Sequence, residues 1–236
     1  MFLKKLSLFS FLILCLQNIY TQTPHDSIKE LIKKEKKDPK KVDLLIDLAI
    51  SYNRKSTDSA VNIAQKALEK AREINYPLGI ADAHNILAWS RFRQSYYKKA
   101  DSLSQKAISY YANIDDVDTK LANSFRLLAA INIEEKKYDA ALKYLLKVKD
   151  IYEAPNLKGS DVQIFVINEI AYLYLEMDNY VMSMKYLNES IASAKANEKS
   201  TILADCYFIL GIINSKQNNY KKSTEYFNLS IASLNF

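Results

Sequence analysis

The stretch IAYLYLEMDNYVMSMKYL, residues 170–187, contains the pattern that decides the fold. A small residue, Ala171, is followed nine positions later by Tyr180, and this tyrosine is followed by a second small residue, Ser183, and by Leu187. Three other segments have the same tyrosine pattern: Tyr97-x2-Ala100-x3-Ser104, Tyr138-x2-Ala141-x3-Leu145 and Tyr220-x2-Ser223-x3-Phe227. Each also has a small residue nine positions before its tyrosine, namely Ala88, Ala129 and Gly211.

A fifth copy lies upstream, with Ala49 and Tyr52 followed by Ala60, but it lacks the tyrosine that opens the second half of the other copies. The second small residues are separated by 40, 41, 42 and 40 residues: Ala60, Ala100, Ala141, Ser183 and Ser223. Between these anchors, apolar residues recur at three- and four-residue intervals, which is the period of an amphipathic helix. We therefore expect each unit to be a helical hairpin whose small residues let two antiparallel helices pack closely.

The composition excludes several other classes of protein. The 236 residues include only 3 glycines and 4 prolines, too few for the frequent tight turns of a β-sandwich or barrel. Gly79, Gly159 and Gly211 are far apart, so the clustered glycines of dinucleotide- and phosphate-binding loops are missing. The fold class predicted is all-α: a right-handed α-solenoid of five antiparallel helix hairpins with one extra N-terminal helix.

These motifs resemble those of the tetratricopeptide repeat (TPR) family, whose pattern is W-x2-L-G-x2-Y followed by A-x3-F. The matching segments are Leu48-Ala49-x2-Tyr52, Ile170-Ala171-x2-Tyr174 and Leu210-Gly211-x2-Asn214, and the resemblance covers residues 40–236. The period differs, near 40 residues rather than about 34, and the closing proline is missing from most units. Long-period arrays of this kind resemble the exported sensor regions of bacterial histidine kinases and transcriptional regulators, and residues 57–68 are similar to those proteins.

The predicted organisation has three parts. Residues 1–21 are a signal peptide, residues 22–39 an N-terminal helix and linker, and residues 40–236 the repeat array. The hairpins are expected at about 40–75, 78–114, 117–153, 160–196 and 199–235.

The N-terminus has the three-part form of a secretory signal. Lys4 and Lys5 precede an apolar run, residues 6–16, that is too short to span a bilayer. We expect cleavage near Thr21-Gln22 and export to the periplasm or the outside of a bacterial cell; the alternative is a retained N-terminal anchor. The formal charge is +6, and its basic residues are scattered except in residues 29–41, which favours a solvated helix face there over contact with an anionic surface. No basic stripe with interleaved aromatics is present, so no nucleic-acid partner is expected.

Candidate catalytic groups are few. The chain has 2 histidines, His25 and His84. His25 is expected to be solvated and His84 to be structural or incidental. Cys206 is the one cysteine beyond the signal segment and is expected to be a small buried hydrophobe. No metal-ligand spacing or nucleophile motif is found, so we expect no catalytic residue, no metal and no cofactor.

The positive hypothesis is binding of a protein or peptide, since a solenoid presents the first helix of each hairpin along its concave side. By register with the repeat, the candidate groove residues are Asn85, Trp89, Phe92, Arg93, Arg126, Asn168, Tyr172 and Glu176. For Trp89 and Phe92 the alternative is packing between adjacent helices. The Asn position of the TPR clamp for a C-terminal carboxylate falls on Ile50, Trp89, Ala130, Tyr172 and Ile212, so that clamp is not expected.

Two functional hypotheses follow: an exported, non-enzymatic scaffold that binds a protein or peptide, or the sensor portion of a membrane histidine kinase or transcriptional regulator. The chain ends in or just after the last predicted helix without a polar capping helix. This suggests a truncated product, a homodimer formed through the last hairpin, or a missing downstream domain that would supply the membrane span.

Overall fold

The computed structural model describes residues 24–53 and 55–234, and this part of the chain is all helical. The predicted signal peptide, residues 1–21, lies outside these described residues. The helices are α2 (Pro24–Lys34), α3 (Asp38–Tyr52), α4 (Thr57–Glu73), α5 (Pro77–Arg93), α6 (Tyr97–Tyr111), α7 (Asp118–Glu134), α8 (Tyr138–Tyr152), α9 (Asp161–Glu176), α10 (Tyr180–Ala196), α11 (Ser200–Lys216) and α12 (Tyr220–Ser233). In this part of the chain, no helix is both long enough and apolar enough to span a membrane.

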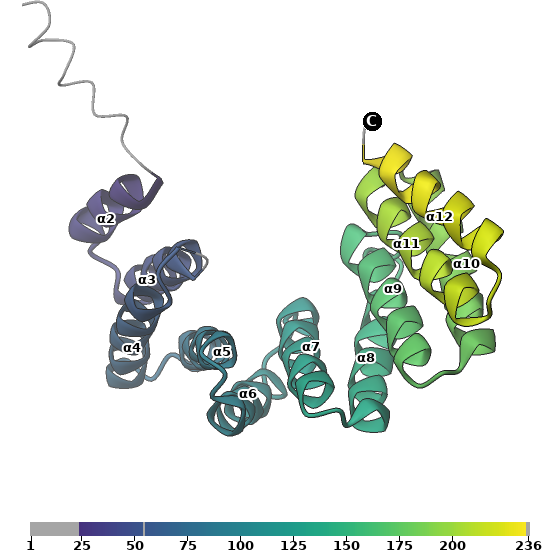
Figure 1. Cartoon of the computed structure of the whole chain (residues 1–236). Coiled ribbons are helices and arrows are strands. Elements are labelled where there is room, and N and C mark those ends of the chain that lie inside the picture. The colour runs from purple at the N-terminus through teal and green to yellow at the C-terminus, as the bar shows by residue number, and fades with distance from the viewer. Residues whose placement is uncertain (1–23, 54, 235–236) are drawn as a thin grey trace, which may run out of the picture.

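The helices form an arch of consecutive pairs, with α3, α5, α7, α9 and α11 on its inner side and their partners on its outer side (Figure 1). Among the described helices, α2 contacts α3, at one end of the arch. The predicted all-α solenoid of five hairpins with an extra N-terminal helix is confirmed for the described residues.

The turns inside the last four helical pairs share one backbone geometry, and none of them contains glycine. Ser95, Lys136, Asp178 and Asn218 all have a left-handed backbone, with φ between 53° and 62°. In each turn the following backbone N–H donates to the carbonyl five residues back, as in Asn179 to Tyr174 at 2.8 Å. This closure satisfies carbonyls at the helix end, and Asp178 and Asn218 are of the residue types that most often adopt the left-handed conformation. The next helix therefore starts at the same place in each repeat, and the low glycine content does not prevent tight turns.

The small residues of the motif lie where the two helices of a pair meet. Ala171 and Ser183 are fully buried, and the Ser183 hydroxyl donates to the Ala171 carbonyl at 2.7 Å, as predicted for this pair. The Ser223 hydroxyl makes the same bond to the Gly211 carbonyl at 2.9 Å. A Cβ atom on Gly211 would lie 2.5 Å from the ring of Phe227, so the close approach there requires glycine.

The prediction that His25 is solvated is wrong. Its side chain is buried, its ring centroid lies 4.3 Å from that of Tyr52, and its Nε2 atom lies 3.4 Å from the Ser51 carbonyl oxygen. The reason is that α2 folds back onto α3 and covers the start of the array. Cys206, by contrast, is fully buried as predicted, and burial raises the pKa of its thiol to about 11.

Candidate binding groove

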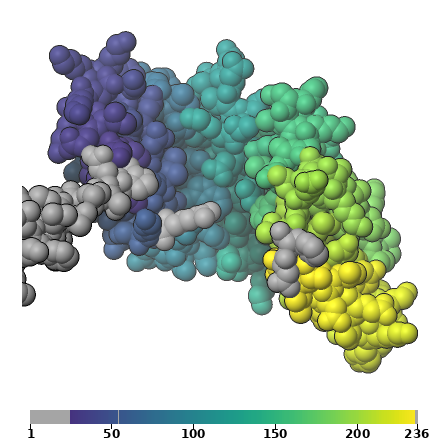
Figure 2. Space-filling view, turned by 90° about the horizontal axis from the view of Figure 1, so that it is seen from above, coloured from purple at the N-terminus to yellow at the C-terminus, as the bar shows by residue number. Residues whose placement is uncertain are grey.

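The inner side of the arch contains two hollows, which we call the N-terminal and the C-terminal hollow. The N-terminal hollow, of about 630 Å³, is lined mainly by α3, α5 and α7. The C-terminal hollow, of about 340 Å³, is lined by α9 and α11 with Ile133 of α7. Figure 2 looks onto this inner side from above. Together the two hollows form a groove that follows the first helices of the pairs.

One register position contributes to the groove in every pair. It lies six residues before the first small residue of the motif, and it is occupied by Asp43, Asp82, Asn123, Phe165 and Asp205. Because successive pairs repeat the same geometry, this position places one side chain of each inner helix on the groove wall. The wall is therefore acidic at both ends and aromatic at Phe165.

The N-terminal hollow contains a hydrogen-bonded carboxylate. Asp82 accepts from the Lys120 ammonium at 2.5 Å and from the Tyr111 hydroxyl at 2.6 Å. Tyr111 itself is 1% exposed. Burial and the neighbouring Asp82 carboxylate raise the pKa of its phenol. Lys120 and Tyr111 thus hold Asp82 in place at the centre of the hollow.

Asp43 occupies the same register position on α3 and forms no ion pair with any cation of residues 24–53 and 55–234. The Tyr76 hydroxyl donates to its carboxylate at 3.1 Å, and the pKa of Tyr76 is raised to about 12 by burial and by Asp43. The pKa of Asp43 is raised, first by burial and also by the nearby carboxylates of Asp82 and Asp47. The surroundings of Asp43 at this end of the hollow therefore disfavour the negatively charged form of its carboxyl group.

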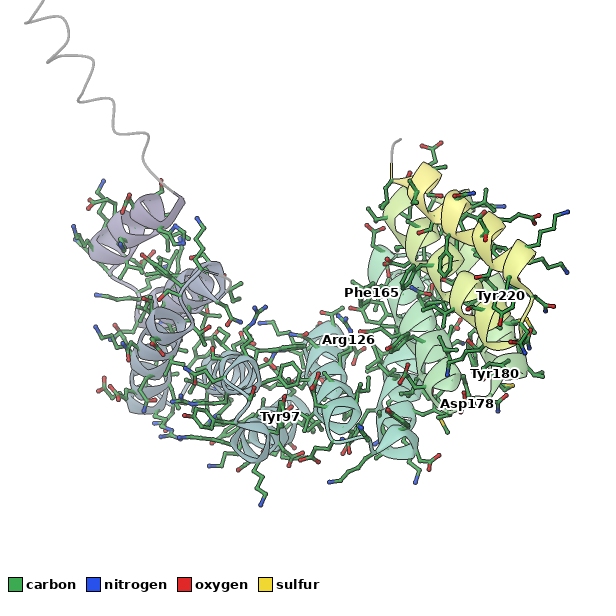
Figure 3. All side chains as sticks on the ribbon, in the orientation of Figure 1. Tyr97, Arg126, Phe165, Asp178, Tyr180 and Tyr220 are labelled. Carbon is green, nitrogen blue, oxygen red and sulfur yellow. The ribbon has the colours of Figure 1, made fainter. Side chains whose placement is uncertain are left out.

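Arg126 crosses from α7 to α9 between the two hollows. Its guanidinium lies over the Phe165 ring, 5.0 Å from the centroid. It also donates two hydrogen bonds to Glu169, from Nε at 3.2 Å and from Nη2 at 3.1 Å. Burial raises the pKa of Glu169, and the Arg126 charge opposes that shift. Figure 3 shows Arg126 and Phe165 on the inner side of the arch.

Three exposed aromatic rings surround the C-terminal hollow. Phe165, Tyr172 and Phe208 are 38%, 41% and 52% exposed, although large apolar side chains are usually covered in a folded chain. The ring of Phe208 rests on Phe227 with centroids 5.6 Å apart, which fixes its orientation. The Phe208 ring thus has little conformational freedom left to lose on binding.

The predicted groove residues divide into those that line a hollow and those that do not. Asn85 and Arg126 line the N-terminal hollow, and Asn168 and Tyr172 line the C-terminal one. Two of the four are largely internal, since Asn85 accepts from the Ser124 hydroxyl at 3.3 Å and Asn168 from the Cys206 thiol at 3.4 Å. Arg93 and Glu176 line neither hollow.

Trp89 and Phe92 follow the alternative interpretation and pack between helices. Both lie against the cluster that contains Ala88, Ala100 and Leu127, and their rings meet edge to face at 5.9 Å. The Trp89 indole nitrogen is buried without a hydrogen-bond partner. Neither residue lines the groove.

Sequence reasoning missed several groove residues: Asp43, Asp82, Lys120, Phe165, Glu169, Asp205 and Phe208. Most of them lie one or two turns before the positions that were chosen. Counting back from the small residue of each motif to the position six residues earlier would have found Asp43, Asp82, Phe165 and Asp205. The signal was present in the repeat register.

Comparison with known proteins agrees with this architecture. No protein-family model matches the chain. A curated mouse protein, interferon-induced protein with tetratricopeptide repeats 2, is 28% identical over 181 residues, which is 70% of this chain but 37% of that protein. The chain thus spans little more than a third of that relative's length.

Solved structures show the fold likeness at low sequence identity. Aspartyl phosphate phosphatase F from Bacillus subtilis superposes with a TM-score of 0.70 and 17% identity, over 95% of this chain and 60% of that one. A Rap protein complexed with Competence and Sporulation Factor superposes with a TM-score of 0.69 and 13% identity, over 89% and 68% of the two chains. At these identities the likeness concerns the arrangement of helical pairs.

Proposed function

We propose that this chain is a tetratricopeptide-repeat protein and acts as a non-enzymatic scaffold that holds a segment of another protein or a peptide in its concave groove. The observation that carries the proposal is the C-terminal hollow, where Phe165, Tyr172 and Phe208 stay exposed on the inner side of the arch. Aromatic side chains at the centre of a concave surface are the groups that dominate protein interfaces. The solved Rap protein, which has the same type of fold, is complexed with a factor.

The proposal that the chain is not an enzyme rests on the chemistry of its titratable groups. His84 is buried, and its pKa is lowered to about 4, first by burial and then by the charges of Arg72 and Lys106. It is thus neutral near pH 7 and lines neither hollow. The carboxylates of Asp82 and Glu169 are held by Lys120 and Arg126. These contacts fit structural roles better than proton transfer to a bound substrate.

The groove is tested by removing two of its exposed rings. The double variant Tyr172→Ala with Phe208→Ala should lower the capture of a groove-bound partner about tenfold or more, because each exposed ring supplies apolar contact area at the centre of the interface. The full chain serves as bait in a crosslinking pull-down, and crosslinked partner peptides are mapped to α9 and α11. Helicity measured by circular dichroism should be unchanged.

The matched control is Tyr220→Ala with Val181→Ala, which removes two side chains that are 65% and 75% exposed on the outer helices α12 and α10. Equal capture by the wild type and the groove variant, with crosslinks elsewhere, would refute the groove as the binding surface. Loss of capture by the outer variant alone would move the site to the convex side.

We also propose that the chain is exported, as the sequence of residues 1–21 suggests. Terminal sequencing of the protein recovered from cell envelope and medium should find Gln22 at the new N-terminus. Recovery of the intact N-terminus from the cytoplasm would contradict export. The alternative function, the sensor portion of a signalling protein, uses the same groove and would be recognised by a kinase or DNA-binding domain encoded with it.

A further inference from the structure

We infer that the partner segment in the C-terminal hollow is cationic and apolar, with an arginine side chain that pairs with Asp205 and stacks on Phe208. This inference rests on the proposed function and adds the chemistry of the partner. The occupant is a peptide segment that carries arginine together with apolar residues.

The protein's own Arg126 shows how this groove binds a guanidinium. Arg126 stacks over Phe165 at 5.0 Å and makes a two-bond pair with Glu169 at 3.1 and 3.2 Å. A planar guanidinium suits both contacts, because it stacks on an aromatic face and matches a carboxylate with two parallel bonds. An aromatic ring beside a carboxylate is thus a guanidinium-binding arrangement in this groove.

The next step along the groove also has a carboxylate beside an aromatic ring, in the opposite order along the helix and without a built-in cation. The residue of α9 that corresponds in register to Arg126 is Asn168, which is buried and does not reach out. Asp205 and Phe208 lie on α11, three residues and thus about one turn apart, and line the hollow together with Phe165 and Tyr172. Across residues 24–53 and 55–234, the Asp205 carboxylate forms no hydrogen bond or ion pair within bonding distance. A carboxylate and exposed rings therefore meet here without a protein cation.

The charge of the whole groove favours the same partner. Among the described residues that line the hollows, the cations are Lys120 and Arg126, and both are already paired, with Asp82 and Glu169. Asp43, Asp47 and Asp205 line the two hollows and, among the described residues, have no cation within ion-pair distance. The chain as a whole carries a formal charge of +6, so its groove is opposite in sign to its overall charge. A cationic segment is attracted to the groove, whereas an acidic one is repelled there.

The apolar part of the partner follows from the lining of the C-terminal hollow. Ile133 and Ile209 line it beside the exposed rings of Phe165 and Tyr172. An apolar side chain of the partner would cover this apolar surface, and its burial favours binding by about 25 cal/mol per Å². Arginine fits better than lysine at the Asp205 end, since the stacked contact on Phe208 needs a planar cation.

The test uses three labelled peptide pools of equal length whose apolar positions are randomised in the same way. Their remaining positions carry arginine, glutamate or serine. Fluorescence anisotropy with the full chain should show the arginine pool binding at least about tenfold more tightly than the serine pool, and the glutamate pool most weakly. Binding of the arginine pool should weaken as salt is raised, because ion pairs at a partly open groove are screened.

Two variants locate the contact. Asp205→Asn keeps the shape and removes the charge, and it should weaken the arginine pool about threefold to tenfold with little effect on the serine pool. The control is Asp178→Asn, which removes a charge of the same sign at the α9–α10 turn, away from the inner side of the arch (Figure 3). This control should leave binding unchanged.

The outcomes separate the inference from the proposed function. One outcome is that the glutamate or serine pool binds as tightly as the arginine pool or more tightly, and that this binding is lost in the double variant of Tyr172 and Phe208. That result contradicts a cationic partner but still supports the groove as the binding surface. If Asp178→Asn weakens binding of the arginine pool as much as Asp205→Asn does, the assigned contact is also contradicted. The net charge of the protein would then explain the effect without a contact to Asp205. If none of the three pools binds, the result contradicts both the cationic partner and the proposed groove scaffold.

Discussion

Replacing Leu127 with alanine is expected to lower the free energy of unfolding by about 2–5 kcal/mol. Leu127 lies on α7, is fully buried, and packs with Ala88 of α5 and Ala100 of α6 in one cluster. Its side chain thus joins the second and third helical pairs. Deleting it removes apolar contacts and leaves a cavity that the packed helices can fill only in part.

The position of Leu127 between pairs also predicts the form of the unfolding curve. In a repeat array each pair is coupled to its neighbours, so a cavity at one interface weakens the cooperation between the two sides. Urea unfolding followed by circular dichroism should show a lower midpoint and a broader transition. Leu229→Ala on α12 is the control, because Leu229 is 45% exposed and its loss should cost less than about 1 kcal/mol. Equal effects of the two substitutions would contradict the assigned core.

Replacing Tyr111 with alanine is expected to cost about 3–5 kcal/mol, as for other buried aromatic residues. Tyr111 closes the floor of the N-terminal hollow, where it contacts Asp82 through its hydroxyl and the core through its ring. The variant loses the packing of the ring and one of the two donors that hold the Asp82 carboxylate. The Asp82 carboxylate, which is 11% exposed, then has fewer hydrogen bonds, and this adds to the cost.

Tyr111→Phe separates these two contributions. The ring stays, and Lys120 still pairs with Asp82, so the cost should fall to about 1–3 kcal/mol, the range for a hydrogen bond to a charged group. Chemical denaturation of both variants at one pH and salt concentration gives the comparison. A phenylalanine variant as unstable as the alanine variant would show that the hydroxyl–carboxylate bond, and not the packing of the ring, accounts for the effect.

The repeat pattern was enough to predict the helical pairs and their contact points. Ala171 and Ser183 were expected to meet across a hairpin, and the hydrogen bond between the Ser183 hydroxyl and the Ala171 carbonyl confirms it. The reason is that small residues, tyrosines and apolar spacing all describe local geometry, and the array has mainly contacts between neighbouring helices. Local information therefore determined most of the fold.

The groove was harder to predict than the helical pairs. The position of a residue in the repeat predicts the direction in which its side chain points, but not how deeply that side chain is buried. Trp89 and Tyr172 occupy the same register position, yet Trp89 packs in a core cluster while Tyr172 is 41% exposed. The difference depends on the surrounding side chains, since Phe92 and Tyr97 of the same pair and Leu127 of the next pair belong to the cluster on which Trp89 packs. The charge of the groove was missed for another reason: the overall balance of +6 does not show that carboxylates gather on one side.

His25 illustrates a third limit. Its position near a proline and far from the repeats suggested a solvated terminus, and nothing local in the sequence indicates that α2 returns to cover Tyr52. Burial at the end of an array depends on how the terminal helix docks, which is a long-range property. The prediction that His25 is solvated failed because His25 lies outside the repeat pattern.

The crossing of Arg126 from α7 to α9 has a mechanical consequence. Inner helices α3 and α5, α5 and α7, and α9 and α11 touch directly, whereas no Cα atom of α7 lies within 8 Å of one in α9. On the inner side this joint is therefore spanned by side chains, among them the guanidinium–carboxylate pair and the stacked ring. Elastic stiffness is lowest where the fewest atoms resist bending, so the curvature of the arch is most compliant at this joint.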